Sequence, residues 1–209
     1  MHVMSRSRCI ALAAATIVLG LGGACTDVVA PTATAPNAGF AGVPIPRRGN
    51  AGGDTVASEF VVYPNVSFTY QLGQGHQVTI PAYTICDPSG SGYGAAMWDA
   101  PCTVLRWPIK VTARSFHDPK GHPVVVFAPD LRFEPTKTVT LYMRDTAAAS
   151  DPAAKIYYCA VGASCVDESL SDPSLTTEVN PHNQFVYRRI KHFSSYVVTN
   201  GETDALPSP

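Results

Sequence analysis

The sequence is poor in charged residues and has no run of one sign. Of its 209 residues, 15% are Asp, Glu, Lys or Arg, and the formal net charge is -1. It contains neither a basic run nor a stripe that combines basic and aromatic residues, so the positive charge that supports nucleic-acid binding is missing. The sequence therefore predicts no nucleic-acid partner.

The common catalytic signatures are missing as well. The sequence has no glycine-rich phosphate loop, no Gly-x-Ser-x-Gly elbow and no Ser/His/Asp arrangement. Asp87, Asp99 and Asp130 fall in different predicted loops, so spacing alone does not bring two carboxylates together. We therefore expect no enzymatic site of these classes and no cofactor.

Metal-ligand patterns are weak. His117 and His122 flank a polar turn that contains Asp118, and histidines in such turns are usually solvated. The acidic segment 167–172 has the charge of a calcium loop but lacks the glycine and the ligand order of an EF-hand. We interpret neither segment as a metal site, so no metal is expected.

The N-terminus has the pattern of a secretory signal. Arg6 and Arg8 precede an apolar run of 13 residues, 9–21, and small residues follow up to Ala24. The run is too short to span a membrane as a helix. Residues 1–24 are therefore predicted to be a signal peptide, and the protein is expected to be exported.

Cys25 follows this segment in the context LGGACTD, which resembles a bacterial lipobox. The resemblance implies lipidation of Cys25 and a membrane anchor in the cell envelope, facing either the periplasm or the surface. The usual leucine lies one position further out, at Leu21, and ordinary signal cleavage after Ala24 is the alternative. Residues 26–57 are rich in Ala, Pro, Gly and Thr and lack periodicity, so 25–57 are interpreted as the lipidated cysteine and a flexible linker.

The remaining cysteines are even in number. One of the six lies in the expected signal peptide and one is Cys25, which leaves Cys86, Cys102, Cys159 and Cys165. In an exported protein this number predicts two disulfides, with three possible pairings. Local pairing, Cys86–Cys102 and Cys159–Cys165, is the simplest. A zinc site is the alternative, but its Cys-x-x-Cys spacing is missing.

Between residues 58 and 199 the sequence reads as short strands separated by turns. In 105–114 the residues Leu105, Trp107, Ile109 and Val111 share one face, and Pro108 places this strand at an edge or a bulge. The continuous apolar run 122–129 predicts a central strand. Further strands are expected within 60–70, 76–83, 137–144, 155–162, 184–190 and 195–199.

No segment reads as a convincing helix. Seven or eight short strands with regular breaks predict an all-β domain at 58–199, an antiparallel, immunoglobulin-like β-sandwich. Residues 200–209 are interpreted as a disordered tail.

Two longer segments carry a family resemblance. LGQGHQVTIPAYTIC (72–86) is a glycine-led strand that ends in Ile-Pro, and VVVFAPDLRFEPTKTVTLYM (124–143) joins two strands through a Pro-x-x-x-Phe turn. In these features the chain resembles the ZU-five domain, a β-sandwich, over about residues 70–199. The long segment 86–102 between two cysteines departs from the family pattern.

His192-Phe193-Ser194 resembles the His-Phe-Ser motif of the module that adjoins ZU-five domains in self-cleaving relatives. The resemblance implies that Ser194 attacks the Phe193 carbonyl with His192 as general base. The alternative is structural, with Phe193 buried in the sandwich at a corner. The apolar alternation of 186–190 breaks down at 191–195, which predicts a bulge, a kink or a strand boundary there.

The expected function is that of a non-catalytic adhesion or interaction module. Its partner would be an envelope or extracellular protein or glycan. Self-cleavage at Phe193–Ser194 is the alternative. A third hypothesis is a carbohydrate- or calcium-binding surface formed by Tyr93 and Trp98 in the segment 86–102, although such aromatics more often pack a loop onto a sandwich.

Overall fold

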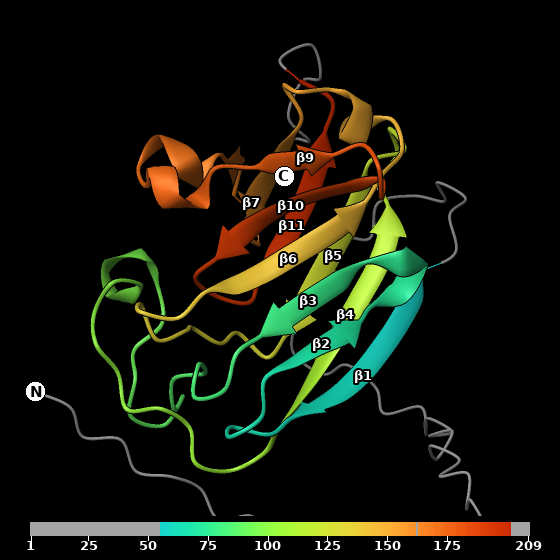
Figure 1. Ribbon diagram of the computed structural model, residues 1–209. Coiled ribbons are helices and arrows are strands. Elements are labelled where there is room, and N and C mark those ends of the chain that lie inside the picture. The colour runs from blue at the N-terminus through green and yellow to red at the C-terminus, as the bar shows by residue number, and fades with distance from the viewer. Residues whose placement is uncertain (1–54, 162, 202–209) are drawn as a thin grey trace, which may run out of the picture. The chain divides into compact units, whose positions relative to one another are not determined.

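The computed structural model describes residues 55–161 and 163–201 (Figure 1). The expected signal peptide at 1–24, Cys25, nearly all of the linker and residues 202–209 of the tail lie outside these described residues. Regular structure begins at Val56, two residues before the expected start of the domain.

The described residues form two antiparallel sheets and short 3₁₀-helices, with no α-helix among them. The six-stranded sheet has the order β1 (Val56–Val62), β4 (Ile109–His117), β5 (Pro123–Ala128), β11 (Ser195–Thr199), β7 (Lys155–Cys159), β8 (Cys165–Val166). The five-stranded sheet has the order β2 (Phe68–Gln71), β3 (Gln77–Ile80), β6 (Val139–Arg144), β10 (Phe185–Ile190), β9 (Glu178–Asn180). The 3₁₀-helices are η1 (Gly73–Gly75), η2 (Ala95–Met97), η3 (Ala148–Ser150), η4 (Glu168–Leu170) and η5 (Pro173–Leu175).

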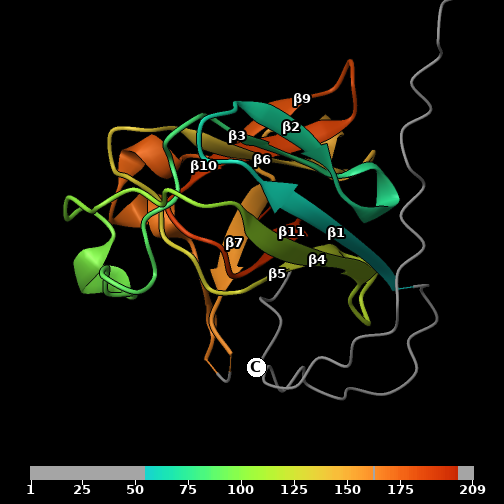
Figure 2. The ribbon, with the colours of Figure 1, turned by 90° about the horizontal axis from the view of Figure 1, so that it is seen from below.

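The two sheets lie face to face as the layers of a β-sandwich (Figure 2). Alternate side chains of each strand point into the space between the layers, as the period-two pattern predicts. Leu141 of β6 and Val186 of β10 are fully buried on one inner face, and Val111 of β4 and Val125 of β5 are fully buried on the other. The expected all-β sandwich is therefore confirmed, with more strands than the seven or eight predicted.

The differences from the predicted strands have local causes. Segment 60–70 forms two strands, β1 and β2, because Pro64 and Asn65 turn the chain from one sheet to the other. The placement of Trp107 on the buried face was wrong, since β4 begins only at Ile109 and Trp107 is 76% exposed. The edge position inferred from Pro108 was also wrong, because Pro108 precedes β4, which pairs on both sides. Strands β8 and β9 are too short to show a pattern.

The predicted break at 191–195 is a crossover between the layers. β10 belongs to the five-stranded sheet and β11 to the six-stranded sheet, so Lys191 to Ser194 carry the chain across the core. Phe193 is completely buried and stacks on Phe127, with ring centroids 4.4 Å apart. The alternation fails here because the inward direction reverses when a chain changes sheets.

The strand registers define two ends of the sandwich. Val56 pairs with Ser115 and Val62 with Ile109, so the chain enters β1 at one end and turns at the other. β11 runs antiparallel to β5 and leaves the sheet at the end where β1 begins. The opposite end carries the turn 63–67, the segment 81–85 and the segment 105–108, which are joined by hydrogen bonds.

Both predicted local disulfides are present, Cys86–Cys102 and Cys159–Cys165. The first closes the long segment that departs from the ZU-five pattern, and the second joins β7 to β8. Disulfides of this kind persist in oxidising compartments, which is compatible with the expected export.

Within the described residues, no helix has the length and hydropathy needed to cross a membrane.

Candidate functional site

A buried polar cluster surrounds His192. The imidazole Nε2 lies 3.2 Å from Oε1 of Glu168, and the other carboxylate oxygen of Glu168 accepts a hydrogen bond of 2.5 Å from Arg188. The three residues are at most 6% exposed. A buried carboxylate needs such charged or hydrogen-bonding partners, because burial alone would favour its neutral form. The chain therefore holds Glu168 in place between a cation and an imidazole.

Two tyrosines occupy the Nδ1 side of the imidazole. The hydroxyl of Tyr93 lies 3.3 Å from Nδ1, and that of Tyr196 lies 3.4 Å from it. Tyr196 also donates a hydrogen bond of 2.7 Å to the carbonyl oxygen of His192, four residues earlier. This contact fixes the corner at which β10 becomes β11, in the manner of a tyrosine corner. Trp98 stacks on the imidazole at a centroid distance of 3.9 Å.

The Phe193–Ser194 peptide bond lies beside this cluster. Tyr93 donates a hydrogen bond of 2.7 Å to the carbonyl oxygen of Phe193. The Ser194 hydroxyl lies close enough to the phenols of Tyr93 and Tyr158 to lower their pKa against the larger effect of burial. The backbone on either side is also bonded, since Phe193 N–H donates to Leu131 and Ser194 O accepts from Phe127 N–H. The bond is thus held by neighbours from four separate parts of the chain.

The cluster keeps its tyrosine phenols protonated. Burial raises the pKa of Tyr93 strongly, with a smaller rise from Asp130 and Tyr158, and the hydrogen bond from Ser194 opposes it. Burial likewise raises the pKa of Tyr158 and, most of all, of Tyr196. The pKa of Asp130 is also raised by burial, against the opposing effect of His192. The phenols are therefore hydrogen-bond donors at neutral pH.

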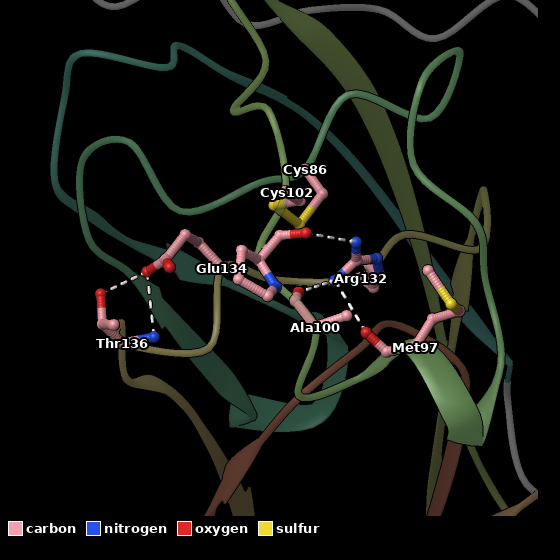
Figure 3. Close-up of a disulfide and its surroundings, with 8 residues drawn as sticks. Cys86, Met97, Ala100, Cys102, Arg132, Glu134 and Thr136 are labelled. Atoms are coloured by element: carbon pink, nitrogen blue, oxygen red, sulfur yellow. Dashed lines mark hydrogen bonds between the residues drawn. A yellow bond between two sulfur atoms is a disulfide. The ribbon is translucent and has the colours of Figure 1, made fainter.

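The segment between Cys86 and Cys102 brings Tyr93 and Trp98 to this site. Figure 3 shows how Arg132 holds the segment: its guanidinium donates to the carbonyl oxygens of Met97 and Ala100, 2.8 and 2.7 Å away, close to the disulfide. A hollow of roughly 130 Å³ lies between the segment and the sandwich, lined among others by Tyr93 and Asp130. The segment therefore covers the His-Phe-Ser crossover.

An ion pair adds a second clamp. Lys191, 9% exposed, donates to the carboxylates of Asp99 in the covering segment and of Asp172 beside η5. Burial alone would lower the pKa of Lys191, but the bonds to Asp172 and Asp99 outweigh it and raise that pKa. Lys191 thus ties three parts of the chain together just before the crossover.

The structure brings together His192, Phe193 and Ser194, but not in the arrangement that the motif implies. Among the hydrogen bonds of the described residues, those of the imidazole go to Glu168, Tyr93 and Tyr196, and none joins it to the Ser194 hydroxyl. Trp98 packs on His192 and Tyr158 instead of forming a free ligand surface.

Sequence reasoning missed several residues of the cluster. Glu168 was weighed only as part of an acidic segment, and Arg188 only as a strand residue. The contact of Tyr196 could have been found from the sequence, because Tyr196 follows His192 by only four residues. The contact of Glu168 with His192 could not, because 24 residues of sequence separate the two.

A second feature lies at the end of the sandwich where β1 turns into β2. Three segments meet there: Tyr83 N–H donates to Pro64 O at 2.5 Å, and Ala82 N–H donates to Ser67 Oγ at 2.8 Å. The large apolar side chains of this end are exposed by 43–76%, and we call them together the aromatic end: Tyr63, Val66, Phe68, Tyr83 and Trp107.

Tyr83 adopts a backbone conformation that large side chains rarely take, with φ of 56°. A strained conformation of this kind costs on the order of 1 kcal/mol, and such costs concentrate at functional positions. Here the conformation places an exposed phenol beside the turn that carries Tyr63.

The histidines of the turn 117–122 have a structural partner. His122 lies 3.2 Å from the Asp118 carboxylate, whose other oxygen accepts from the His122 backbone N–H. Within the described residues, no group of three or more His, Cys, Asp or Glu side chains is arranged to hold a metal ion.

Comparison of the chain with protein-family models, with curated proteins and with solved structures gives no match, so the proposals that follow rest on the sequence and the fold.

Proposed function

We propose that this chain is a lipid-anchored protein of the bacterial cell envelope, whose ZU-five-like β-sandwich acts as a non-catalytic interaction module. The observation that carries the proposal is the aromatic end. Four aromatic rings and a valine stand exposed together there, although a sandwich needs none of them in water for its own stability. Clustered exposed aromatics are typical of surfaces that bind a partner.

The position of the aromatic end suits this function. The chain enters β1 at the opposite end of the sandwich, and β11 also ends there. A linker attached at Val56 would therefore leave the aromatic end free. Export is supported by the two disulfides, and anchoring by the lipobox-like sequence at Cys25.

The interaction is tested by binding of the fluorescently labelled protein to intact cells and isolated envelopes. Saturable binding is expected, and Trp107→Ala should weaken it at least tenfold because Trp107 is the most exposed ring. Leu170→Ala is the matched control, since Leu170 is 86% exposed on η4 and is not one of the residues of the aromatic end. Equal binding by all three proteins would contradict the proposal.

Anchoring is tested by Cys25→Ser, which should move the protein out of the membrane fraction.

A second candidate function is self-cleavage of the Phe193–Ser194 bond. It is favoured by one observation, the hydrogen bond of 2.7 Å from Tyr93 to the Phe193 carbonyl oxygen. This is the oxygen on which negative charge develops when a nucleophile attacks, and a protonated phenol would stabilise that charge. The raised pKa of Tyr93 keeps the phenol protonated.

The chemistry can be written for the residues present. Ser194 Oγ would bond to the Phe193 carbonyl carbon while its proton moves to the Tyr93 oxygen and the proton that Tyr93 carried moves to Nδ1 of His192, so that the phenol still has one proton to donate to the carbonyl oxygen. The carbon–nitrogen bond would then break, and the proton would go to the new amine of Ser194. Water would hydrolyse the resulting ester to a Phe193 carboxylate and a free Ser194 hydroxyl. Glu168 would hold the imidazole and stabilise its charged form.

Intact mass of the purified protein tests this candidate. If cleavage occurs, the wild type gives two fragments, one ending at Phe193 and one beginning at Ser194, and Ser194→Ala gives one full-length species. The non-catalytic proposal expects one full-length species in both. Tyr93→Phe would slow cleavage if the phenol acts as written.

A further inference from the structure

The side chains of the aromatic end are held on three separate segments of backbone. Trp107 precedes β4, Tyr63 follows β1, and Tyr83 follows β3. The hydrogen bonds between the segments 64–67 and 82–83 fix the turns that carry the rings. The ring of Phe68 packs against the ring of Tyr70, with centroids 4.9 Å apart. The rings are therefore presented by rigid backbone, which limits the entropy lost when a ligand binds.

The polar groups between these rings are almost all uncharged. Segments 62–68, 80–85 and 105–109 contain a single charged residue, Arg106, and the Lys110–Glu59 ion pair and Glu134, whose N–H donates to Thr84 O, lie beside them. The exposed side chain of Asn65 and the hydroxyls of Tyr63 and Tyr83 add neutral donors and acceptors. This end of the molecule offers flat apolar faces together with neutral hydrogen-bonding groups.

This combination matches a neutral sugar chain better than the other partners of an envelope protein. The ring face of a pyranose presents C–H groups, which can stack on an aromatic ring, and its edge presents hydroxyls, which can bond to amides and phenols. An anionic membrane would be expected to select a cluster of Lys and Arg, and a protein partner gains its orientation from pairs of complementary charges. The three segments of the aromatic end contribute one charged residue, Arg106, and therefore carry no basic cluster.

We infer that the aromatic end is a binding site for a neutral polysaccharide, with Trp107 as its main stacking surface and Tyr63 and Tyr83 as further exposed rings. This inference rests on the proposed interaction function and names the chemical class of its partner. Because the site is open on the surface, it would bind internal stretches of a long chain and not only its end.

Affinity electrophoresis of the full-length protein tests the inference. The gels contain a neutral polysaccharide (laminarin, xyloglucan, galactomannan or mixed-linkage glucan) or, for comparison, alginate or polygalacturonate. Vesicles of phosphatidylethanolamine and phosphatidylglycerol test the membrane separately by co-sedimentation. Retardation is expected in at least one neutral gel, reduced at least tenfold in apparent affinity by Trp107→Ala and more weakly by Tyr63→Ala. Leu170→Ala should migrate like the wild type, and thermal unfolding should show that all variants are folded.

The outcomes separate this inference from the proposed function. Retardation only in acidic gels, binding only to vesicles, or no retardation in any neutral gel would overturn the sugar assignment. If binding to envelopes still depended on Trp107 in that case, the partner would belong to another chemical class and the interaction function would stand. If Trp107→Ala changed neither kind of binding, both would fail.

Discussion

The phenol of Tyr93 donates a hydrogen bond to the carbonyl oxygen of Phe193 across 100 residues of sequence. The same hydroxyl lies 3.3 Å from His192 Nδ1. One side chain of the disulfide-closed segment thus contacts two residues of the His-Phe-Ser motif, and the pKa of its phenol is lowered by the Ser194 hydroxyl. Whether or not the bond is cleaved, Tyr93 links the covering segment to the crossover between the sheets.

Tyr93→Phe tests the strength of this link. The change removes the hydroxyl and keeps the ring, so the Phe193 carbonyl and Ser194 lose a partner. We expect a loss of about 1 kcal/mol in the free energy of unfolding, since the site is partly open to water. Chemical denaturation measures it. Tyr187→Phe, whose phenol bonds to exposed Glu178, is the control and should change little. Equal effects of the two changes would argue against a specific contribution of Tyr93.

Glu168→Gln should be strongly destabilising. The amide keeps the shape but leaves the buried Arg188 without its counter-charge, and breaking such a buried pair typically costs about 3–5 kcal/mol. Glu59→Gln is the matched control, because Glu59 pairs with Lys110 at the surface and such pairs contribute about 0–1 kcal/mol. Comparable losses in the two variants would show that the pair with Arg188 contributes less than its burial implies.

His76 should make the fold sensitive to acid. Its side chain is 1% exposed, and its Nδ1 accepts a hydrogen bond of 2.9 Å from Arg144 N–H. Burial lowers the pKa of His76 to about 4; the charge of His117 adds to this effect and that of Asp145 opposes it. Between the ordinary pKa of 6.5 and this value the unfolded chain binds a proton that the folded protein does not. The free energy of unfolding is therefore highest above this pH window and decreases as the pH falls through it. The decrease is about 2 kcal/mol between neutral pH and the lower part of the window.

The variant His76→Gln should flatten this dependence, measured as unfolding free energy against pH. His182→Gln, at an exposed turn, should leave the slope of the wild type unchanged. An unchanged slope in His76→Gln would assign the acid sensitivity to other groups.

The two disulfides should differ in their contribution to stability. Cys86–Cys102 spans 16 residues and Cys159–Cys165 spans 6, and the loop-closure estimate gives about 3 and about 2 kcal/mol. Replacing each pair by serines and measuring unfolding tests the order. Loss of the first pair should also increase protease cleavage within 87–101, although Arg132 and Lys191 still hold that segment. A larger loss from the Cys159–Cys165 pair would contradict the estimate.

The sequence by itself determined the fold class and the covalent framework. Alternation of apolar residues, as in 139–143, reports which side of a strand is buried, because the side-chain period of a strand is two. The even number of cysteines and their spacing indicated two local disulfides, which the structure contains. The loss of alternation at 191–195 marked the position where the chain changes sheets, although it did not say that this is the reason.

Only the tertiary structure decided what surrounds His192 and where the aromatic rings gather. Glu168, Arg188 and Tyr93 meet there because sheet pairing and one disulfide bring together segments that are far apart in sequence. Alternation placed Trp107 on one face with Ile109 and Val111, and only the start of β4 after Pro108 shows that Trp107 lies outside that strand. A local sequence pattern predicts which face of its own strand a side chain lies on. A site also depends on the register between strands, and that register is decided by the packing of the whole core.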